Sequence, residues 1–193
     1  DIDHPTREKW RTVIPESNDV LDGVTMANDQ FVALYMHHAA HRIYLFARDG
    51  AAAGEIALPS LGSLTRFDSL GINCQRSDHE LFYAFQSFNI PPTVYRYDFI
   101  QKASQVLFKP SVDFDPQTYV IEQRFVTSKD GTQIPLFLVH RQDLQIDGHN
   151  ATLLYGYGGF NIPVLPTFAI TWLVWLEMGG VLAVANLRGG GEY

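Results

Sequence analysis

The chain is poor in cysteine, because Cys74 is the only one among 193 residues. One thiol excludes an internal disulfide framework and fits a reducing compartment, so we predict a cytoplasmic protein stabilised by a hydrophobic core. The first residues show no basic stretch followed by an apolar core, so no secretory signal is predicted. Because the sequence opens at Asp1 without an initiator methionine, we expect the natural chain to begin upstream.

Blocks of basic residues are also missing. Lysine and arginine number 14 against 21 aspartates and glutamates, giving a net charge of −7 that is scattered along the chain. Nucleic acids and anionic membranes attract proteins through clustered positive charge. The composition therefore argues against either of them as a partner.

No apolar run is long enough to span a bilayer, which requires about 20 residues. Residues 162–187 come nearest, but prolines, one glutamate and the glycine pair at 179–180 divide them. Within this segment we predict a buried helix over residues 167–178 that ends at the glycines, followed by a buried strand over residues 181–186.

Short runs of β-branched and aromatic residues predict antiparallel β-structure from residue 1 to about residue 110. The predicted strands are residues 10–14, 31–36, 42–47, 55–58, 81–85, 93–97 and 105–108. Shifting the chain by 50 positions places residues 31–35, 44–46 and 55–58 over residues 81–85, 94–96 and 105–108. A period of about 50 residues with three or four strands is typical of propeller blades. A β-sandwich with hairpins of similar length is the alternative.

The pattern changes near residue 112. Predicted strands at residues 119–128 and 133–140 flank an Asp-Gly turn, and a strand of buried character follows at residues 152–155. With the helix and strand after it, this is the order that opens an α/β sheet. We therefore predict two parts, a partial propeller over residues 1–111 and an incomplete α/β domain over residues 112–193.

Two apolar runs end in glycine-rich segments, residues 155–161 (Tyr-Gly-Tyr-Gly-Gly-Phe-Asn) and 186–193 (Asn-Leu-Arg-Gly-Gly-Gly-Glu-Tyr). Such loops after buried strands lie at the carboxyl edge of a sheet, where open α/β folds bind ligands. A tyrosine hydroxyl there stays protonated near neutral pH and can donate to a developing oxyanion. A tight glycine turn with packed aromatic rings explains the first segment equally well.

Both segments resemble the prolyl oligopeptidase family of serine peptidases, as do residues 128–132 (Ser-Lys-Asp-Gly-Thr) and 134–135 (Ile-Pro). The resemblance implies a seven-bladed β-propeller joined to an α/β-hydrolase domain. The expected fold is therefore the C-terminal blades of a partial β-propeller followed by the N-terminal part of an α/β-hydrolase domain. Residues 155–160 are more similar to the prolyl-specific branch than to the oligopeptidase that cleaves after basic residues.

The resemblance also implies roles for two residues. Tyr157 would be the side-chain donor of the oxyanion hole, and Phe160 would line the pocket for the proline ring of the substrate. Residues 188–193 would form a structural loop near the site. The implied substrates are short proline-containing peptides, cleaved on the carboxyl side of proline, with the propeller restricting access to the interior.

The chain lacks the Gly-x-Ser-x-Gly nucleophile elbow of such hydrolases. In the family the elbow and its acid and histidine partners follow the stretch that resembles residues 188–193. We therefore expect this chain to be an inactive piece of a serine endopeptidase, with the rest of the hydrolase domain as its partner. A non-catalytic propeller interaction module is one alternative, and an esterase or acyl-transfer relative with another pocket is a second.

No metal or cofactor is expected. His37 and His41 are four residues apart, but a zinc-peptidase helix needs glutamate where His38 stands, and predicted strands flank the segment, which indicates a solvated hairpin tip. His140 is predicted to be a strand-end residue, and Cys74 a buried or incidental thiol. Neither glycine-rich segment has a complete dinucleotide fingerprint or a Walker lysine.

Overall fold

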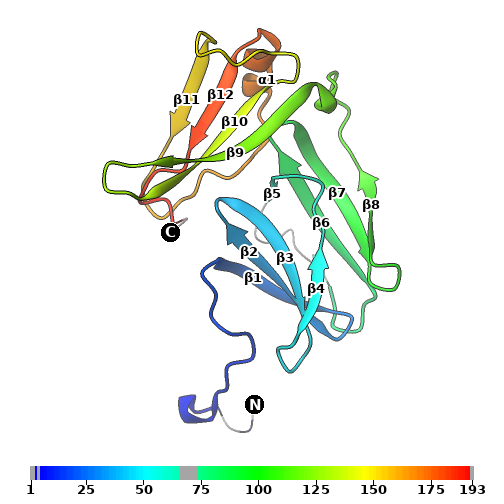
Figure 1. Ribbon diagram of the computed structural model, residues 1–193. Helices are drawn as coiled ribbons and strands as arrows, with labels where there is room; N and C mark the ends of the chain where they lie inside the picture. Colours follow the sequence, from blue (N-terminus) through cyan, green and yellow to red (C-terminus); the bar gives the residue numbers. More distant parts are fainter. Residues whose placement is uncertain (1–2, 4, 66–73, 192–193) are drawn as a thin grey trace.

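The computed structural model describes residues 3, 5–65 and 74–191, which form three four-stranded sheets (Figure 1). The first contains β1 (Val20–Ala27), β2 (Gln30–His37), β3 (Ala40–Phe46) and β4 (Ala52–Ile56). The second contains β5 (Ser63–Leu64), β6 (Glu80–Ser87), β7 (Ile90–Asp98) and β8 (Ala103–Phe108). The third contains β9 (Tyr119–Thr127), β10 (Gln133–Arg141), β11 (Thr152–Gly156) and β12 (Val181–Ala185). The helices are η1 (Arg7–Lys9), η3 (Pro116–Thr118) and α1 (Ile170–Glu177).

The predicted 50-residue repeat is confirmed by the first two sheets. β2 begins at Gln30 and β6 at Glu80, while β3 begins at Ala40 and β7 at Ile90. In each sheet the strands pair antiparallel in chain order, from β1 to β4 and from β5 to β8. Four-stranded antiparallel units of this kind are the blades of propellers.

One apolar core joins these two sheets. Its fully buried members include Leu34 and Ile43 from the first sheet and Leu81 and Phe85 from the second. Because the cluster contains residues of both sheets, each sheet shields an apolar face of the other sheet from water.

His41 adds a polar link between the two sheets. Its Nδ1 atom accepts a hydrogen bond from the Leu64 amide at 2.8 Å, and its Nε2 atom lies 3.0 Å from Asp22 Oδ2. Because Nδ1 accepts, the ring proton is on Nε2 and is donated to the carboxylate. With 7% of its surface exposed, His41 is a structural histidine.

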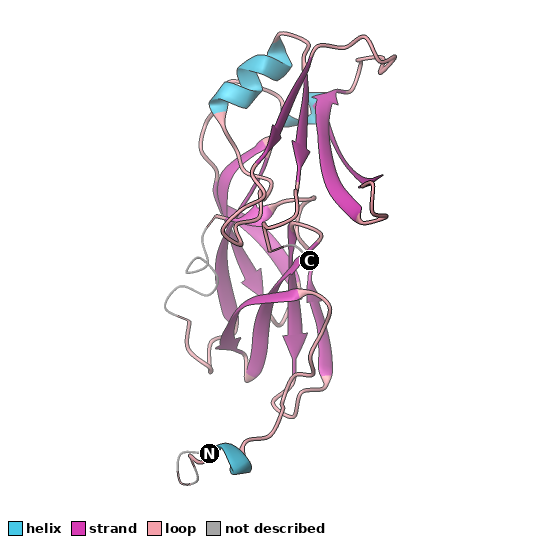
Figure 2. Cartoon of the chain, turned by 90° about the vertical axis from the view of Figure 1, so that its left-hand side faces the viewer, coloured by secondary structure: helices cyan, strands magenta, loops and turns pink. Residues whose placement is uncertain are grey.

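The third sheet has the order β11-β12-β10-β9, and only its β11–β12 pair is parallel. Helix α1 connects these two parallel strands, as the strand–helix–strand pattern predicted. Leu173 and Leu176 of the helix pack in one cluster with Phe137, Val139 and Leu182 of the sheet. Figure 2 shows α1 beside this sheet, at the end of the molecule opposite the N-terminus.

The strand predicted at residues 10–14 is wrong, and β1 and β5 were not predicted. Residues 10–14 have no strand pairing, and the Trp10 side chain is largely exposed. In β1 the pair Asp22 and Gly23 interrupts the apolar pattern, where the register shifts between Leu21 and Gly23. A bulge of this kind places consecutive side chains out of alternation, which hides a strand from a period-two pattern.

The predicted burial of β11 is wrong, and the predicted burial of the helix holds only for the side that carries Leu173 and Leu176. All five residues of β11 are exposed, because within the described residues this strand pairs only with β12. The helix spans Ile170–Glu177 rather than residues 167–178, and Ile170 and Val174 on its outer side are exposed. An apolar sequence predicts that a surface will be covered, but it does not say which segment covers it.

The first two sheets share a second core with the third. Phe88, in the turn between β6 and β7, lies with its ring centroid 5.6 Å from that of Phe137 in β10 and 5.6 Å from that of Trp172 in α1. Ser63 Oγ in β5 donates to the carbonyl oxygen of Pro166 at 2.7 Å. The blade-like sheets are therefore joined to the third sheet by packed rings and by buried polar contacts.

The hairpin tip at residues 37–41 is solvated only in part: the His38 side chain is exposed, as predicted, but Ala39 and the residues after it in the tip are buried. The turn residues His38 and Ala39 have φ values of 50° and 60°. Gln123 Nε2 in β9 donates to the carbonyl oxygen of His38, and the His38 ring packs edge-on against Phe125 at 4.8 Å. The tip is covered by a strand that begins about 80 residues later, which local spacing could not reveal.

Stability should fall in mild acid through His38. Desolvation, and next the neighbouring His37, lower the pKa of His38 below its ordinary value of 6.5. The unfolded chain therefore binds the proton more tightly, and stability is lost as the pH falls from about 6.5 through the lowered pKa. We expect His38→Asn, which tolerates the positive φ, to reduce the loss in Tm between about pH 7.5 and about pH 5.5.

The measurement is thermal unfolding of the whole protein at both pH values, with His149→Asn as a control in an exposed loop. If His38→Asn and His149→Asn change the pH dependence equally, His38 is not responsible for it.

Candidate functional site: a glycine-rich edge of the third sheet

The two glycine-rich segments leave the same edge of the third sheet. β11 ends at Gly156 and β12 at Ala185, and these two residues are partners in the parallel pair. The carboxyl ends of both strands therefore open together into residues 157–162 and 186–191, as the sequence predicted.

The two segments pack so closely that only glycine fits at several positions. At Gly158, with φ of 63°, a Cβ atom would lie 2.7 Å from Leu187 Cβ. At Gly189, with φ of 99°, a Cβ atom would lie 2.9 Å from the Gly158 carbonyl oxygen. The Asn161 amide also donates to the Gly189 carbonyl oxygen at 2.9 Å. The two segments are thus one packed unit.

A tight turn projects Phe160 from this unit. Phe160 and Asn161 have φ values of 54° and 57°, and the Ile162 amide donates to the Gly159 carbonyl oxygen at 3.0 Å. A bulky residue with positive φ is uncommon and costs about 1–3 kcal/mol of backbone strain, which clusters at functional sites. Phe160 is 88% exposed, so this strain is not offset by burial of its ring.

The structure brings the two predicted site residues together. The ring centroids of Tyr157 and Phe160 lie 6.5 Å apart with a 32° tilt, and Tyr157 is 49% exposed. Two exposed rings on a rigid glycine turn provide an aromatic surface on which a compact apolar ring can stack. The tyrosine hydroxyl adds a hydrogen-bond donor beside that surface.

The contact of Arg188 with the β9–β10 turn is a feature of the site that the sequence did not reveal. The Arg188 Nη2 atom donates to Asp130 Oδ2 at 2.6 Å and to Thr132 Oγ1 at 2.9 Å. Arg188 also holds the pKa of the Asp130 carboxyl well below its usual range. Both partners lie in residues 128–132, which resemble the family, but Arg188 is 58 positions from Asp130 and the sequence gave no signal of their contact. Glu192 and Tyr193, the last residues of the predicted structural loop, lie outside the described residues.

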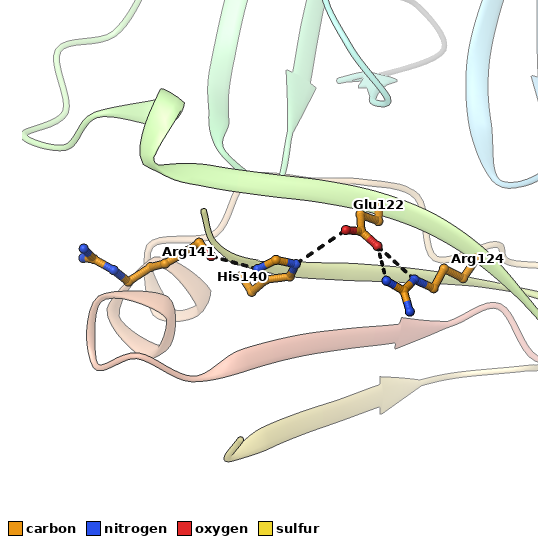
Figure 3. A network of polar contacts seen from close by, with 4 residues as sticks. All are labelled: Glu122, Arg124, His140 and Arg141. Atoms are coloured by element: carbon orange, nitrogen blue, oxygen red, sulfur yellow. Dashed lines mark hydrogen bonds and ion pairs between the residues drawn. The ribbon is translucent and has the colours of Figure 1, made fainter. Parts of the chain in front are cut away.

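His140 is a strand-end residue within β10, as predicted (Figure 3). Its Nδ1 atom donates to the Arg141 carbonyl oxygen at 2.8 Å, and its Nε2 atom lies 3.7 Å from Glu122 Oε1. Arg124 Nε donates to Glu122 Oε2 at 2.8 Å, and this contact lowers the pKa of Glu122. The network ties β9 to β10.

The other candidates have structural partners. Cys74 is half-buried with Sγ 3.4 Å from the Met26 carbonyl oxygen, and desolvation raises its thiol pKa, which disfavours the thiolate. His37 Nδ1 lies 2.6 Å from Asp19 Oδ1. In residues 3, 5–65 and 74–191, no three histidine, cysteine or acidic side chains are grouped to hold a metal ion. The same residues include no helix with the length and apolar character needed to cross a bilayer.

Residues 1–110 match the family model described as the prolyl oligopeptidase N-terminal β-propeller domain. The prolyl endopeptidase of Elizabethkingia meningoseptica is 38% identical over 192 residues, covering 100% of this chain and 26% of that protein. The dual function macrocyclase-peptidase POPB of Galerina marginata is 35% identical over 190 residues, covering 95% of this chain and 25% of that protein.

Solved structures of prolyl endopeptidases and prolyl oligopeptidases are also similar to this chain. One, from a structural and mechanistic study of two prolyl endopeptidases, has a TM-score of 0.85 at 37% identity, covering 98% of this chain and 27% of that one. Another is a variant of prolyl oligopeptidase B from Galerina marginata bound to a 25mer macrocyclization substrate. It has a TM-score of 0.83 at 33% identity, and the match covers 95% of this chain and 26% of that one.

The repeated four-stranded sheets and the matching family model define a β-propeller protein, not the β-sandwich alternative. The chain belongs to the prolyl oligopeptidase family. It spans about a quarter of the length of the Elizabethkingia and Galerina relatives, 26% of the first and 25% of the second.

Proposed function

We propose that this chain is part of a serine endopeptidase that hydrolyses short peptides on the carboxyl side of proline. Two of its relatives are named prolyl endopeptidases and align with all of it. The observation that carries the proposal is the Tyr157 ring, half-exposed beside Phe160 at the carboxyl edge of a parallel strand pair.

In this proposal residues 1–111 are the C-terminal blades of a propeller, and residues 112–193 are the first part of an α/β-hydrolase domain. The parallel pair joined by α1 supports the second assignment. The exposed apolar residues of β11 and of the outer side of α1 are surfaces that further strands and helices of the domain would cover. That remainder would supply the serine, acid and histidine, and the single cysteine is consistent with a cytoplasmic location.

The proposed chemistry is acyl transfer. The serine hydroxyl attacks the carbonyl carbon of the scissile amide, and the histidine takes the serine proton and gives it to the leaving amine. The acyl group then remains on the serine as an ester, which a water molecule deprotonated by the histidine hydrolyses, and the proton returns to the serine. Negative charge develops on the carbonyl oxygen, where the Tyr157 hydroxyl donates a hydrogen bond. Phe160 stacks on the proline ring, and the propeller restricts the site to small, flexible peptides.

The test is hydrolysis by the whole protein of matched chromogenic peptides with proline, alanine or arginine before the scissile bond. We expect kcat/KM to favour proline by about 100-fold, the size of discrimination that one well-filled pocket provides. Cleavage of an activated ester without cleavage of any peptide would favour the esterase alternative. No hydrolysis of either substrate would favour the interaction module.

Removing the Phe160 ring should weaken selection for proline. In the whole enzyme we expect Phe160→Ala to lower kcat/KM for the proline peptide about tenfold, mainly through KM, because about 1–2 kcal/mol of ring contact is lost. Phe160→Tyr keeps the ring and should retain most of the activity. Steady-state kinetics on the proline and alanine peptides provide the measurement, and an unchanged ratio between them would contradict the stacking role.

A further inference from the structure

The turn between β9 and β10 holds its aspartate in a fixed position. The Gly131 amide donates to the Ser128 carbonyl oxygen at 2.9 Å, and the Ser128 amide donates to the Thr132 carbonyl oxygen at 2.8 Å. The Thr132 amide donates to Asp130 Oδ1 at 3.2 Å. One carboxylate oxygen of Asp130 is thus bound within its own turn, and the other is available to a partner.

That partner is Arg188, which follows β12. A single guanidinium nitrogen contacts both Asp130 Oδ2 and Thr132 Oγ1. The end of β12 is also tied to the start of β10, because the Asn186 amide donates to the Pro135 carbonyl oxygen at 2.9 Å. Arg188 therefore ties the segment at residues 187–191 to the turn of the β9–β10 hairpin.

This contact contributes little to global stability. The Arg188 and Asp130 side chains are 60% and 51% exposed, and exposed ion pairs contribute about 0–1 kcal/mol. In the segment at residues 187–191, Arg188 is followed by three glycines, whose backbone has more freedom than that of any other residue. The glycines have no side chain that could bind a neighbouring element, so the side-chain contacts of Arg188 restrict the backbone freedom of this segment.

The anchored segment lies directly against the neighbours of Tyr157. A Cβ atom at Gly156 would be 2.9 Å from Leu187 Cδ1, and one at Gly158 would be 3.1 Å from the Arg188 carbonyl oxygen. Tyr157 is therefore flanked on both sides by residues that rest on the segment at residues 187–191. Displacement of that segment displaces the Tyr157 backbone.

We infer that Arg188, held by Asp130 and Thr132, is a positioning residue that fixes the Tyr157 hydroxyl for the reaction. The inference rests on the proposed function above. Arg188 acts through the loop and does not touch the reacting atoms, so its effect appears in the transition state and not in substrate binding.

In the whole peptidase, Arg188→Ala should lower kcat for the proline peptide about tenfold and leave KM nearly unchanged, since misplacement of a donor weakens interactions made in the transition state. Asp130→Asn keeps the acceptor for the Thr132 amide but removes the charge, so a smaller loss in kcat is expected. Arg188→Lys keeps the charge and should restore part of the rate.

A double-mutant cycle separates positioning from a general structural defect. With Tyr157→Phe already present, Arg188→Ala should cause no further fall in kcat, because the donor that it positions is gone. A general defect would lower kcat by the same factor in both backgrounds. Arg141→Ala is the matched control, since Arg141 pairs with Asp143 at 2.9 Å in another exposed contact, and it should leave kcat unchanged.

Two results overturn the inference alone: Tyr157→Phe lowers kcat while Arg188→Ala does not, or the two losses multiply independently. If Tyr157→Phe itself leaves kcat unchanged, the oxyanion role of Tyr157 in the proposed function is overturned, and the inference is overturned with it.

Discussion

Tyr157→Phe is expected to lower kcat of the whole peptidase about 100-fold, with KM and Tm little changed. Loss of one oxyanion donor typically costs about 2.7–4 kcal/mol of transition-state stabilisation, because the hydrogen bond is strongest where the charge develops, and the lower end of this range corresponds to about 100-fold in rate. The Tyr157 ring is half-exposed, so removal of its hydroxyl leaves no buried polar group without a partner. Steady-state kinetics and thermal unfolding of the same preparations provide the measurement.

Tyr155→Phe is the matched control for this substitution. Tyr155 is also exposed and lies in β11, two residues before Tyr157. Its ring centroid is 6.1 Å from that of Trp172, whereas the Tyr157 ring lies beside Phe160. We expect Tyr155→Phe to leave kcat close to that of the unmodified enzyme. Equal losses in the two variants would mean that the effect arises from the loop and not from the Tyr157 hydroxyl.

Phe88→Ala is expected to cause the largest loss of stability, about 3–5 kcal/mol in the free energy of unfolding. Phe88 is 1% exposed and packs against Phe137 and Trp172, so the substitution opens a cavity where the propeller meets the third sheet. At this joint Phe88 therefore contributes an apolar contact of the second sheet with both β10 and α1.

Denaturant unfolding of the whole protein measures the loss, and limited proteolysis at residues 109–118 reports opening of the joint. Phe108→Ala is the control, because Phe108 belongs to the same sheet and is 60% exposed. We expect that control to change stability by about 0.5 kcal/mol or less. If Phe88→Ala cost less than about 1 kcal/mol, the joint would not depend on these rings.

The propeller repeat could be read from the sequence because its signals are local. β2 and β6 have the same length and are both rich in aromatic residues, 50 residues apart. β1 escaped detection because its bulge at Asp22 and Gly23 removes the alternation that marks a strand. The short β5 has only two residues, too few for any period to show.

In the candidate site, too, the features with a local sequence pattern could be predicted and those that depend on distant segments could not. The place of Tyr157 and Phe160 at a sheet edge followed from an apolar run that ends in glycines, which is a local pattern. The contact of Arg188 with Asp130 and the contact of β9 with the tip at residues 37–41 depend on segments far apart in the chain. Such contacts are set by the packing of the third sheet, and one sequence carries no signal of it.

The most direct measurement is the structure of the whole peptidase with a peptidyl-proline aldehyde bound to its serine. We expect the Tyr157 hydroxyl to lie about 2.7–3.1 Å from the oxygen anion of the adduct, with the proline ring against Phe160. A hydroxyl that bonds instead to nearby main chain, with the anion held by other donors, would contradict the role assigned to Tyr157.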